Sequence, residues 1–499
     1  MKKRASGVLA PIFSLPNEYG IGDFGSCCYK FIDYLARAGQ TVWQILPLVE
    51  TGYGNSPYSS VSSYSFSPYY ISPEILYKEK LISKKELNAQ KCNKPTIDYG
   101  YLYSTRQELL RKAFSRFDKT NPEFVKSVKS KKYLDYALFM SLKTLNDYKP
   151  FYEWDAPYKT REKLALKRFY KENEEQVLFY QFVQFMAETE WKNVKEYANY
   201  NGVSIMGDLP LYVALDSVDV WANPTLFKLD ENYFPKKVAG VPPDYFSKDG
   251  QLWGNPVYDY AVHEETGFAW WTDRIVNALK NYDLIRIDHF RGLDRYYEID
   301  SNAETARVGE WKEVPHDKLF NAIHKRVNKN KIIAEDLGVI DDGVRALLKS
   351  VGYPGMKILS FAFNDDKTNP YLPENITENS VCFTGTHDND TLLGLIKSLS
   401  ALEKERFVKG VKQSLKHQKK VMRVNTDVGL LRAITWLGFN SKSKLFIIPL
   451  SDLFCLDENY RINIPGAVRQ ENWAIRYSEK FFTKSSAEKL KILTKNSKR

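Results

Sequence analysis

The stretch Leu-Ile-Arg-Ile-Asp-His at residues 284–289 decides the fold. It is a short apolar run that ends in charged residues, as expected of a buried strand whose last residues reach a functional edge. Arg286 and Asp288 are two positions apart, so their side chains share one face of the strand. An acid at the end of an apolar strand costs free energy unless it is paired or takes part in chemistry. The stretch therefore predicts a buried strand that delivers Asp288 to a functional site.

Seven further short apolar runs are of the same kind, and stretches with helical periodicity separate them. After the first run, apolar residues recur every three or four positions from Cys28 to Ala36, and Gly39 follows as a stop signal. Strand alternating with helix eight times predicts an α/β fold in which parallel βα units close into a (β/α)8 TIM-type barrel. A doubly wound sheet is the alternative, but it gives no reason for eight repeats. The expected strands are Gly7–Phe13, Thr41–Pro47, Val203–Leu209, Leu284–Asp288, Lys331–Glu335, Met356–Phe361, Ser380–Thr384 and Leu445–Pro449.

Two long insertions are predicted to form subdomains around the barrel mouth. Residues 1–75 hold the first βα units, and residues 201–499 hold the remainder of the catalytic barrel. Between them, residues 76–200 are lysine-rich and mostly helical in pattern, which predicts an inserted helical subdomain. The segment 212–256 is rich in Pro, Gly, Asp and aromatic residues. We expect this segment to form loops above the barrel mouth, including a lid.

The composition is that of a globular protein with an excess of basic and aromatic residues. The 499 residues are 43% hydrophobic and 27% charged, which excludes a disordered chain. The 72 Lys and Arg against 61 Asp and Glu give a net charge of +11. The lysines cluster in helix-like stretches without a nucleic-acid-binding motif, so solvated helix faces explain them better. Aromatic residues make up 14%, and their faces suit sugar rings, although they also fill large cores.

The cysteines and the hydropathy indicate a cytoplasmic protein. Five cysteines without a Cys-x-x-Cys pair are too few and too scattered for a disulfide framework, so a reducing compartment fits best. No run approaches the ~18 apolar residues of a membrane helix. Pro11 interrupts an N-terminal apolar run that could otherwise pass for a signal peptide. We therefore expect neither membrane nor nucleic acid among the partners, and a monomer or weak homo-oligomer.

Acidic residues stand at the ends of four of the expected strands. Asp208, Asp288 and Glu335 end the third, fourth and fifth strands, and Asp388 follows the seventh. Catalytic residues of such a barrel lie at the carboxyl ends of the strands, so these acids are expected to converge on one mouth. Glycoside chemistry needs two carboxyl groups, one to attack or to activate water and one to protonate the leaving oxygen. Arg286 beside Asp288 favours the ionised form that a nucleophile requires.

Other chemistries find less support in the sequence. His289 and His387 could bind a metal ion together with the aspartates, but no ligand spacing such as His-x-x-x-His occurs. The Gly-x-Ser-x-Gly elbow, the Walker A motif and the Rossmann glycine pattern are also missing from the sequence. We therefore expect neither a metal ion nor a cofactor.

An ordered series of motifs runs nearly the whole length of the chain. The first half contains Gly20–Asp23, Trp43–Leu48, Ser56–Tyr58, Gly207–Pro210, Asp216–Ala222, Pro242–Ser247 and Gly250–Pro256, and the second half contains Arg286–Gly292, Ala334–Gly338, Gly385–Asp388, Arg461–Gly466 and Asn472–Trp473. In this order the motifs resemble those of the amylomaltase family, the 4-α-glucanotransferases or disproportionating enzymes of the α-amylase superfamily. Any one motif is weak, whereas the ordered series is specific.

The resemblance implies a retaining 4-α-glucanotransferase that moves α-1,4-glucan segments between malto-oligosaccharide, starch or glycogen chains by double displacement. Asp288 would be the nucleophile, Glu335 the general acid/base, and Asp388 the acid that stabilises the transition state. The implied substrate-binding residues are Arg286, His289, His387 and Asp208 where the bond breaks, Tyr58, Ser56, Trp253 and Asn463 around it, and Tyr245 and Phe246 on a mobile loop over the cleft. Trp253 as loop core and Ser56 as a turn residue are the simpler alternatives.

Two alternatives in function remain open at the level of sequence. An α-amylase-type hydrolase would use the same acids, and it differs only in that water rather than a sugar 4-hydroxyl resolves the glycosyl-enzyme. A non-catalytic glucan-binding protein would have no use for an acid/base pair. The chain departs from the family pattern at Ser451, Ala467 and Glu374. These departures bear on acceptor-side contacts and chain-length preference, not on the catalytic acids.

Overall fold

A parallel sheet of eight strands forms the centre of the molecule in the computed structural model, which describes residues 4–52, 54–243 and 248–499. Its strand order is β10-β11-β12-β1-β2-β3-β6-β9, and Ala334 at the end of β9 donates a hydrogen bond to the carbonyl of Pro354 just before β10 at 3.0 Å. The sheet is therefore a nearly closed barrel, and the predicted (β/α)8 fold is confirmed. The strands are β1 Ala5–Leu9, β2 Val42–Gln44, β3 Ser204–Leu209, β6 Leu284–Ile287, β9 Ile332–Ala334, β10 Gly355–Ile358, β11 Ser380–Phe383 and β12 Leu445–Pro449.

Each barrel strand overlaps an expected apolar run, but β1, β2 and β10 end three or four residues earlier than predicted. β1 stops at Leu9, and a turn of 3-10 helix at Ile12–Ser14 follows Pro11, which has no N–H to continue the strand ladder. The register pairs Asp208 of β3 with Arg286 of β6, and Ile287 of β6 with Ala334 of β9. The carboxyl ends of these three neighbouring strands therefore lie side by side.

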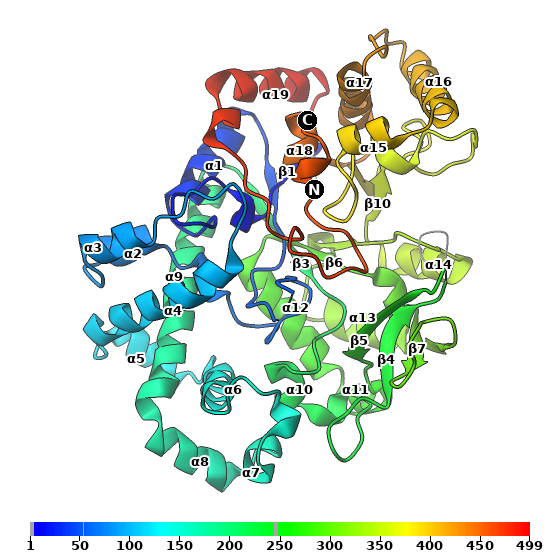
Figure 1. Cartoon of the computed structure of the whole chain (residues 1–499). Coiled ribbons are helices and arrows are strands. Elements are labelled where there is room, and N and C mark those ends of the chain that lie inside the picture. The colour runs from blue at the N-terminus through cyan, green and yellow to red at the C-terminus, as the bar shows by residue number, and fades with distance from the viewer. Residues whose placement is uncertain (1–3, 53, 244–247) are drawn as a thin grey trace.

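The chain between β2 and β3 forms a mainly helical layer on one side of the barrel, coloured cyan in Figure 1. Its longest helix, α9, packs on α1 (Ser26–Arg37) and runs directly into β3. Aromatic rings such as Phe114, Phe117 and Phe182 fill the space between α9 and the shorter helices. The helices of this layer are α2 Pro73–Lys78, α3 Lys84–Ala89, α4 Tyr99–Arg116, α5 Pro122–Lys129, α6 Leu134–Leu145, α7 Ala156–Lys159, α8 Lys163–Glu172 and α9 Glu174–Tyr200.

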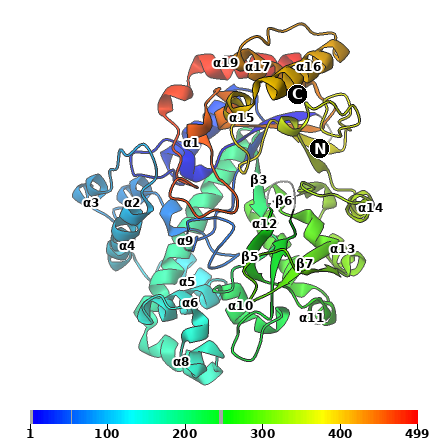
Figure 2. The same ribbon diagram turned by 45° about the vertical axis from the view of Figure 1, so that its right-hand side comes forward.

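A second, antiparallel sheet of four strands stands beside the barrel in the order β5-β4-β7-β8, seen at the lower right of Figure 1 and nearer the centre in Figure 2. Its strands are β4 Lys237–Val241, β5 Gln251–Pro256, β7 Arg295–Asp300 and β8 Glu310–Glu313. Two of them lie in the segment 212–256, where the sequence predicted loops, so the prediction missed these strands. The residues of this segment between 244 and 247, including Tyr245 and Phe246, lie outside the described residues.

The remaining helices cover the barrel between its strands and at its end. β1 and β12 pair in parallel over five residues, and Arg499 donates to the carbonyl oxygen of Ala5 at 2.9 Å. The C-terminal residue therefore lies beside the start of β1. Within the described residues, no helix is long and apolar enough to cross a membrane. The helices are α10 Val218–Ala222, α11 Tyr260–Glu265, α12 Ala269–Asn281, α13 His316–His324, α14 Asp342–Val351, α15 Leu392–Ser398, α16 Ala401–His417, α17 Asp427–Asn440, α18 Leu450–Leu453 and α19 Lys484–Asn496.

Candidate active site

Arg286 joins the carboxyl ends of β3 and β6 through a fork of hydrogen bonds. Its guanidinium donates to both carboxylate oxygens of Asp208, at 2.9 and 2.7 Å, and to Oδ1 of Asp288 at 2.8 Å. The side chains of Arg286 and Asp208 are almost completely buried. Burial disfavours the charged guanidinium, but Asp208, Tyr58 and Asp288 together raise its pKa above the usual value. Arg286 is therefore a fixed cation that orients two carboxylates.

Asp288 lies just past the end of β6, where its side chain is 27% exposed. Its backbone N–H donates to the carbonyl of Leu209 at 3.0 Å, which holds it in register with β3. Burial raises the pKa of Asp288 to about 6, although Arg286 lowers it. The neighbouring carboxylates Asp208 and Asp388 contribute to the rise.

Glu335 follows β9 and receives two backbone N–H groups. His289 donates to Oε2 at 2.7 Å and Leu337 donates to Oε1 at 2.8 Å. Burial and the charge of Asp288 raise the pKa of Glu335 to about 8, against the effect of Arg286 and of these two hydrogen bonds. The two acids thus differ in protonation at neutral pH, with Asp288 ionised and Glu335 protonated. Two neighbouring carboxyls with pKa values pushed apart are the arrangement expected of a nucleophile and a general acid.

Asp388 is held by side chains from the loop after β11 and the segment after β12. Asn463 donates to Oδ1 at 2.7 Å, and Nε2 of His387 lies 3.2 Å from Oδ2. Burial alone would raise the pKa of Asp388, but His387 and the Asn463 hydrogen bond outweigh it and lower the pKa to about 2. Arg461 also donates to the Asp388 carbonyl at 3.2 Å. Asp388 is therefore a permanently ionised carboxylate at physiological pH.

Tyr58 connects the loop after β2 to this group of charges. Its hydroxyl donates to Asp208 and accepts a hydrogen bond from Arg286 at 3.2 Å. Its ring stacks on His387, with centroids 5.1 Å apart and planes 8° from parallel, and lies 5.9 Å from the ring of Trp473. Ser56 accepts a hydrogen bond from the Tyr58 N–H at 3.3 Å, so its hydroxyl shapes the turn that presents Tyr58.

Trp253 and His289 meet on the side of the second sheet. Their rings are perpendicular with centroids 4.8 Å apart, and Trp253, on β5, remains 36% exposed. Trp253 is therefore a partly open ring beside the acids rather than loop core. Burial lowers the pKa of His289 to about 4, so this imidazole is neutral at physiological pH. Its backbone has a positive φ of 48°, an unfavourable conformation for a residue with a side chain and one found often at functional sites.

The structure brings Asp208, Arg286, Asp288, His289, Glu335, His387, Asp388, Asn463, Tyr58 and Trp253 together through the contacts above. Three further contributors were not singled out from the sequence: Arg461, Trp473 and the backbone N–H of Leu337. Arg461 and Trp473 belong to two motifs near the end of the chain. Those motifs could have indicated both residues as part of the site. The Leu337 donor could not be predicted from the sequence, because a backbone N–H is present at every residue except proline. Within the described part of the chain, no three His, Cys, Asp or Glu side chains group as ligands for a metal ion.

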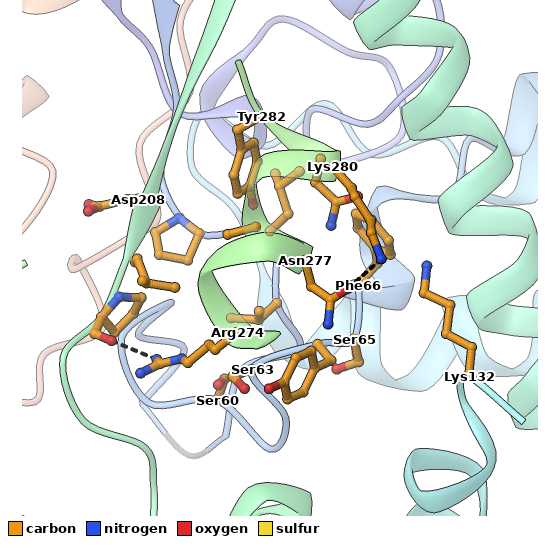
Figure 3. Close-up of a pocket in the computed structure, with 18 of the residues that line it drawn as sticks. Ser60, Ser63, Ser65, Phe66, Lys132, Asp208, Arg274, Asn277, Lys280 and Tyr282 are labelled. Atoms are coloured by element: carbon orange, nitrogen blue, oxygen red, sulfur yellow. Dashed lines mark hydrogen bonds between the residues drawn. The ribbon is translucent and has the colours of Figure 1, made fainter. Parts of the chain in front are cut away.

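A separate cavity of about 180 Å³ lies behind the strand end, between the chain after β2 and α12. Ser60, Ser65 and Phe66 line one side, and Asn277 and Lys280 of α12 line the other. Figure 3 shows Asp208 at its edge, on the far side of β3 and directed away from the cavity. The cavity therefore borders the group of acids through Asp208, whereas Asp288, Glu335 and Asp388 do not line it.

Fold and site together define a (β/α)8 enzyme that acts on glycosidic bonds. A family profile described as 4-alpha-glucanotransferase matches residues 10–482. The 4-alpha-glucanotransferase of Clostridium butyricum is 40% identical over 97% of this chain and 98% of that protein, and the enzyme of Synechocystis is 41% identical over 96% and 94%. An amylomaltase from Streptococcus agalactiae, solved in complex with acarbose, superposes with a TM-score of 0.93 at 36% identity and complete coverage of both chains.

The chain belongs to the 4-alpha-glucanotransferase family. The resemblance in its motifs and the prediction of a glucan-transferring enzyme are thereby confirmed. An amylomaltase from Corynebacterium glutamicum, 18% identical with a TM-score of 0.78, has the same fold over 99% of this chain and 75% of its own.

Proposed function

We propose that this enzyme transfers α-1,4-glucan segments between malto-oligosaccharide, starch or glycogen chains by double displacement, with retention of the α configuration. The observation that carries the proposal is the pair of carboxyls at adjacent strand ends. Asp288 is paired with a buried guanidinium, and Glu335 is held by two backbone N–H groups with its pKa raised to about 8. Such a pair supplies one nucleophile and one proton donor at neutral pH.

In the first step, an Asp288 carboxylate oxygen attacks the anomeric carbon of the donor. The bond from that carbon to the glycosidic oxygen breaks, and Glu335 gives its proton to the departing 4-oxygen. The products are a covalent glycosyl-enzyme on Asp288, a shortened glucan and an ionised Glu335. Arg286 holds the Asp288 carboxylate in one orientation through its contact at 2.8 Å, which favours attack along a single direction.

In the second step, the 4-hydroxyl of an acceptor glucan attacks the same anomeric carbon. Glu335 takes the hydroxyl proton, the bond to Asp288 breaks, and both acids return to their starting protonation states. Two inversions at one carbon give net retention. This chemistry is complete with the residues of the chain and the two glucans.

Asp388 is proposed to bind hydroxyl groups of the sugar at the scissile bond and to stabilise positive charge as it develops there. Its ionised state, held by His387 and Asn463, supports that role, because a fixed negative charge stabilises an oxocarbenium-like transition state. Arg286, Asp208, His289 and His387 are proposed to surround the same sugar.

The neighbouring glucose units are proposed to contact aromatic and hydroxyl groups around the acids. Tyr58, Trp253 and Asn463 stand within the group of contacts described above, and Ser56 supports the Tyr58 turn. Tyr245 and Phe246 are proposed to form the lid. The similar amylomaltase from Streptococcus agalactiae was solved in complex with acarbose, which supports a saccharide ligand for this enzyme.

Transfer and hydrolysis by the same acids are distinguished by the products formed from maltotriose. Incubation of the pure protein followed by chromatography is expected to give glucose and a ladder of oligosaccharides longer than maltotriose. Maltose and glucose alone would establish an α-amylase-type hydrolase and overturn the proposal.

Two broader features belong to the same proposal. Residues 76–200 are proposed to act as a subdomain, supported by the helical layer from α2 to α9 that borders the chain after β2. The five cysteines are unpaired, which supports a reducing compartment such as the cytoplasm. The enzyme is proposed to work as a monomer or weak homo-oligomer.

A further inference from the structure

The chain between β2 and α2 carries a loop that presents Tyr58 to the acids. We call its described residues, 48–52 and 54–67, the substrate loop. Its two arms pair like a hairpin, because Gly52 donates to the Ser59 carbonyl at 3.0 Å and Val61 donates to the Glu50 carbonyl at 3.1 Å. Tyr58 stands near the tip of this hairpin, where its hydroxyl reaches Asp208 and Arg286. The position of Tyr58 therefore depends on how the base of the hairpin is fixed.

Apolar packing fixes that base in part, because Leu48, Val61 and Phe66 are buried in the main core. The returning arm, with Ser60, Ser65 and Phe66, lines the cavity of about 180 Å³ that separates it from α12, as Figure 3 shows. A side that faces a cavity lacks the dispersion contacts that hold a packed side in place. On that side, polar contacts supply further restraint.

Among the described residues, the returning arm has three such restraints to other elements. The Val218 N–H, at the start of α10, donates to the Val61 carbonyl at 2.8 Å. Asp219 of α10 accepts hydrogen bonds from the backbone and the hydroxyl of Ser63. Gln184 of α9 accepts from the Phe66 N–H at 2.7 Å and donates to the Phe66 carbonyl at 2.9 Å. This arm is therefore fastened to the barrel side and to the helical layer.

The outgoing arm is fastened to the helical layer by one side-chain contact. Tyr136 of α6 donates its hydroxyl hydrogen to Oε2 of Glu50, and these residues are separated by 86 positions in the chain. The Tyr136 side chain is buried, with 3% of the residue exposed, so its hydroxyl has no easy alternative in water. Loss of Glu50 would remove this hydrogen bond from the buried Tyr136 hydroxyl and leave it only its second partner, Gln184.

We propose that Tyr136 and Glu50 are positioning residues for glucan transfer: their hydrogen bond holds the outgoing arm of the substrate loop, and thereby holds Tyr58 at Asp208 and Arg286. The inference rests on the proposed role of Tyr58 as a substrate contact. It assigns to α6 of the helical layer a function in substrate affinity, because the loop must occupy one position before a glucan binds.

The expected effect is on KM more than on kcat. When a loop occupies its binding-competent position only a fraction of the time, the apparent dissociation constant rises by the inverse of that fraction. A loop in place a tenth of the time weakens apparent affinity about tenfold. The Tyr136–Glu50 hydrogen bond holds Tyr58 in the same position in the bound ground state and in the transition state. Its loss therefore changes kcat little.

The test uses the full-length enzyme with maltotriose as substrate. Tyr136→Phe and Glu50→Leu are each expected to raise KM about five- to tenfold with kcat within about twofold of wild type, and together their effects are less than additive. Glu50→Gln keeps an acceptor oxygen for Tyr136 and is expected to restore most of the affinity lost in Glu50→Leu. If Tyr136→Phe does not fold, Glu50→Leu and Glu50→Gln decide the question.

Tyr180→Phe is the matched control. Tyr180 of α9 lies beside Tyr136, with ring centroids 6.2 Å apart, and its hydroxyl shares a hydrogen bond of 2.6 Å with Thr144 instead of the substrate loop. This variant removes a buried phenol hydroxyl from the same layer and is expected to leave KM unchanged. An equal rise of KM in Tyr180→Phe would overturn the inference, as would folded Tyr136→Phe and Glu50→Leu enzymes with wild-type KM.

Tyr58→Ala separates the inference from the proposal on which it rests. An unchanged KM in Tyr58→Ala removes the proposed substrate contact and the inference with it. If KM rises in Tyr58→Ala but stays at the wild-type value in Tyr136→Phe and Glu50→Leu, the substrate contact of Tyr58 stands. Only the positioning role of Tyr136 and Glu50 is then rejected.

Discussion

The backbone N–H of His289 donates to the carboxyl of Glu335 at 2.7 Å, from a residue with a positive φ of 48°. His289 directly follows Asp288, so a single unfavourable backbone conformation places the two acids relative to each other. The energetic cost of that conformation, of order 1–3 kcal/mol, is met by the surrounding structure. The proposed nucleophile and the proposed proton donor are thus fixed through the main chain as well as through side chains.

Replacement of Glu335 by Gln is expected to lower kcat for maltotriose by about 10²–10⁴, because the leaving 4-oxygen loses its proton donor. A donor with a leaving group that needs no protonation, such as α-maltosyl fluoride, is expected to react with a much smaller loss in the first step. Initial rates with maltotriose and with α-maltosyl fluoride are compared to check the role of Glu335 as the general acid. Equal losses on both donors would contradict an acid function for Glu335.

Asp288→Asn is expected to reduce turnover by about 10⁴ or more, in line with the removal of other nucleophiles. The amide cannot form the glycosyl-enzyme, although it retains the shape of the carboxyl and a hydrogen-bonding oxygen for Arg286. Melting temperature and circular dichroism establish that the variant is folded. A folded variant with a tenth of wild-type activity would exclude Asp288 as the nucleophile.

The two raised pKa values predict a bell-shaped dependence of kcat/KM on pH. Activity is expected to rise as Asp288 loses its proton near pH 6 and to fall as Glu335 loses its proton near pH 8. Because the two carboxyls interact, the limbs report apparent pKa values of the pair. In Glu335→Gln the alkaline limb should disappear while the acid limb remains. Persistence of the alkaline limb would assign it to another group.

Asn463→Ala is expected to lower kcat about 10- to 100-fold, the equivalent of one hydrogen bond of about 1.5–3 kcal/mol to a charged group. The Asn463 side chain holds Oδ1 of Asp388 at 2.7 Å and helps to keep its pKa low. Asn440→Ala is a suitable control, because Asn440 bonds only to the Trp436 carbonyl of its own helix among the contacts described. An Asn463→Ala enzyme with wild-type kcat would place Asp388 outside the reacting sugar.

The double variant Tyr245→Ala with Phe246→Ala is expected to raise hydrolysis relative to transfer and to weaken the binding of long glucans. A lid over the glycosyl-enzyme excludes water and so favours a sugar acceptor. The ratio of reducing ends released to oligosaccharides elongated measures the effect. A stable double variant with the wild-type ratio would rule out a lid function for these residues.

The barrel and its acids were accessible from sequence because local signals encode them. β6 and β9 are largely apolar runs with an acid directly after them. Each of these strands can be predicted from its own residues, without knowledge of the neighbouring strands in the sheet. The second sheet was missed for the opposite reason. β8, at Glu310–Glu313, contains one aromatic residue among charged ones, and it becomes a strand through its pairing with β7.

The contacts that support the site also could not be predicted from local sequence patterns. Glu50 and Tyr136 are unremarkable in their own segments, and their contact requires α6 to pack beside the substrate loop. The pKa order of Asp288 and Glu335 likewise depends on burial and mutual repulsion. Sequence suggested that Arg286 would keep Asp288 ionised. Arg286 does lower its pKa, but burial outweighs it and leaves the value near 6.

The pairing of β1 with β12 constrains how the chain can fold during its synthesis. One edge of β1, the first of the barrel strands to be synthesised, finds its partner only when residues 445–449 have emerged from the ribosome. Until then the nascent barrel keeps open strand edges, which are templates for wrong pairing and aggregation. Chains that terminate before residue 445 would carry all three proposed catalytic acids and still be unable to close the ring.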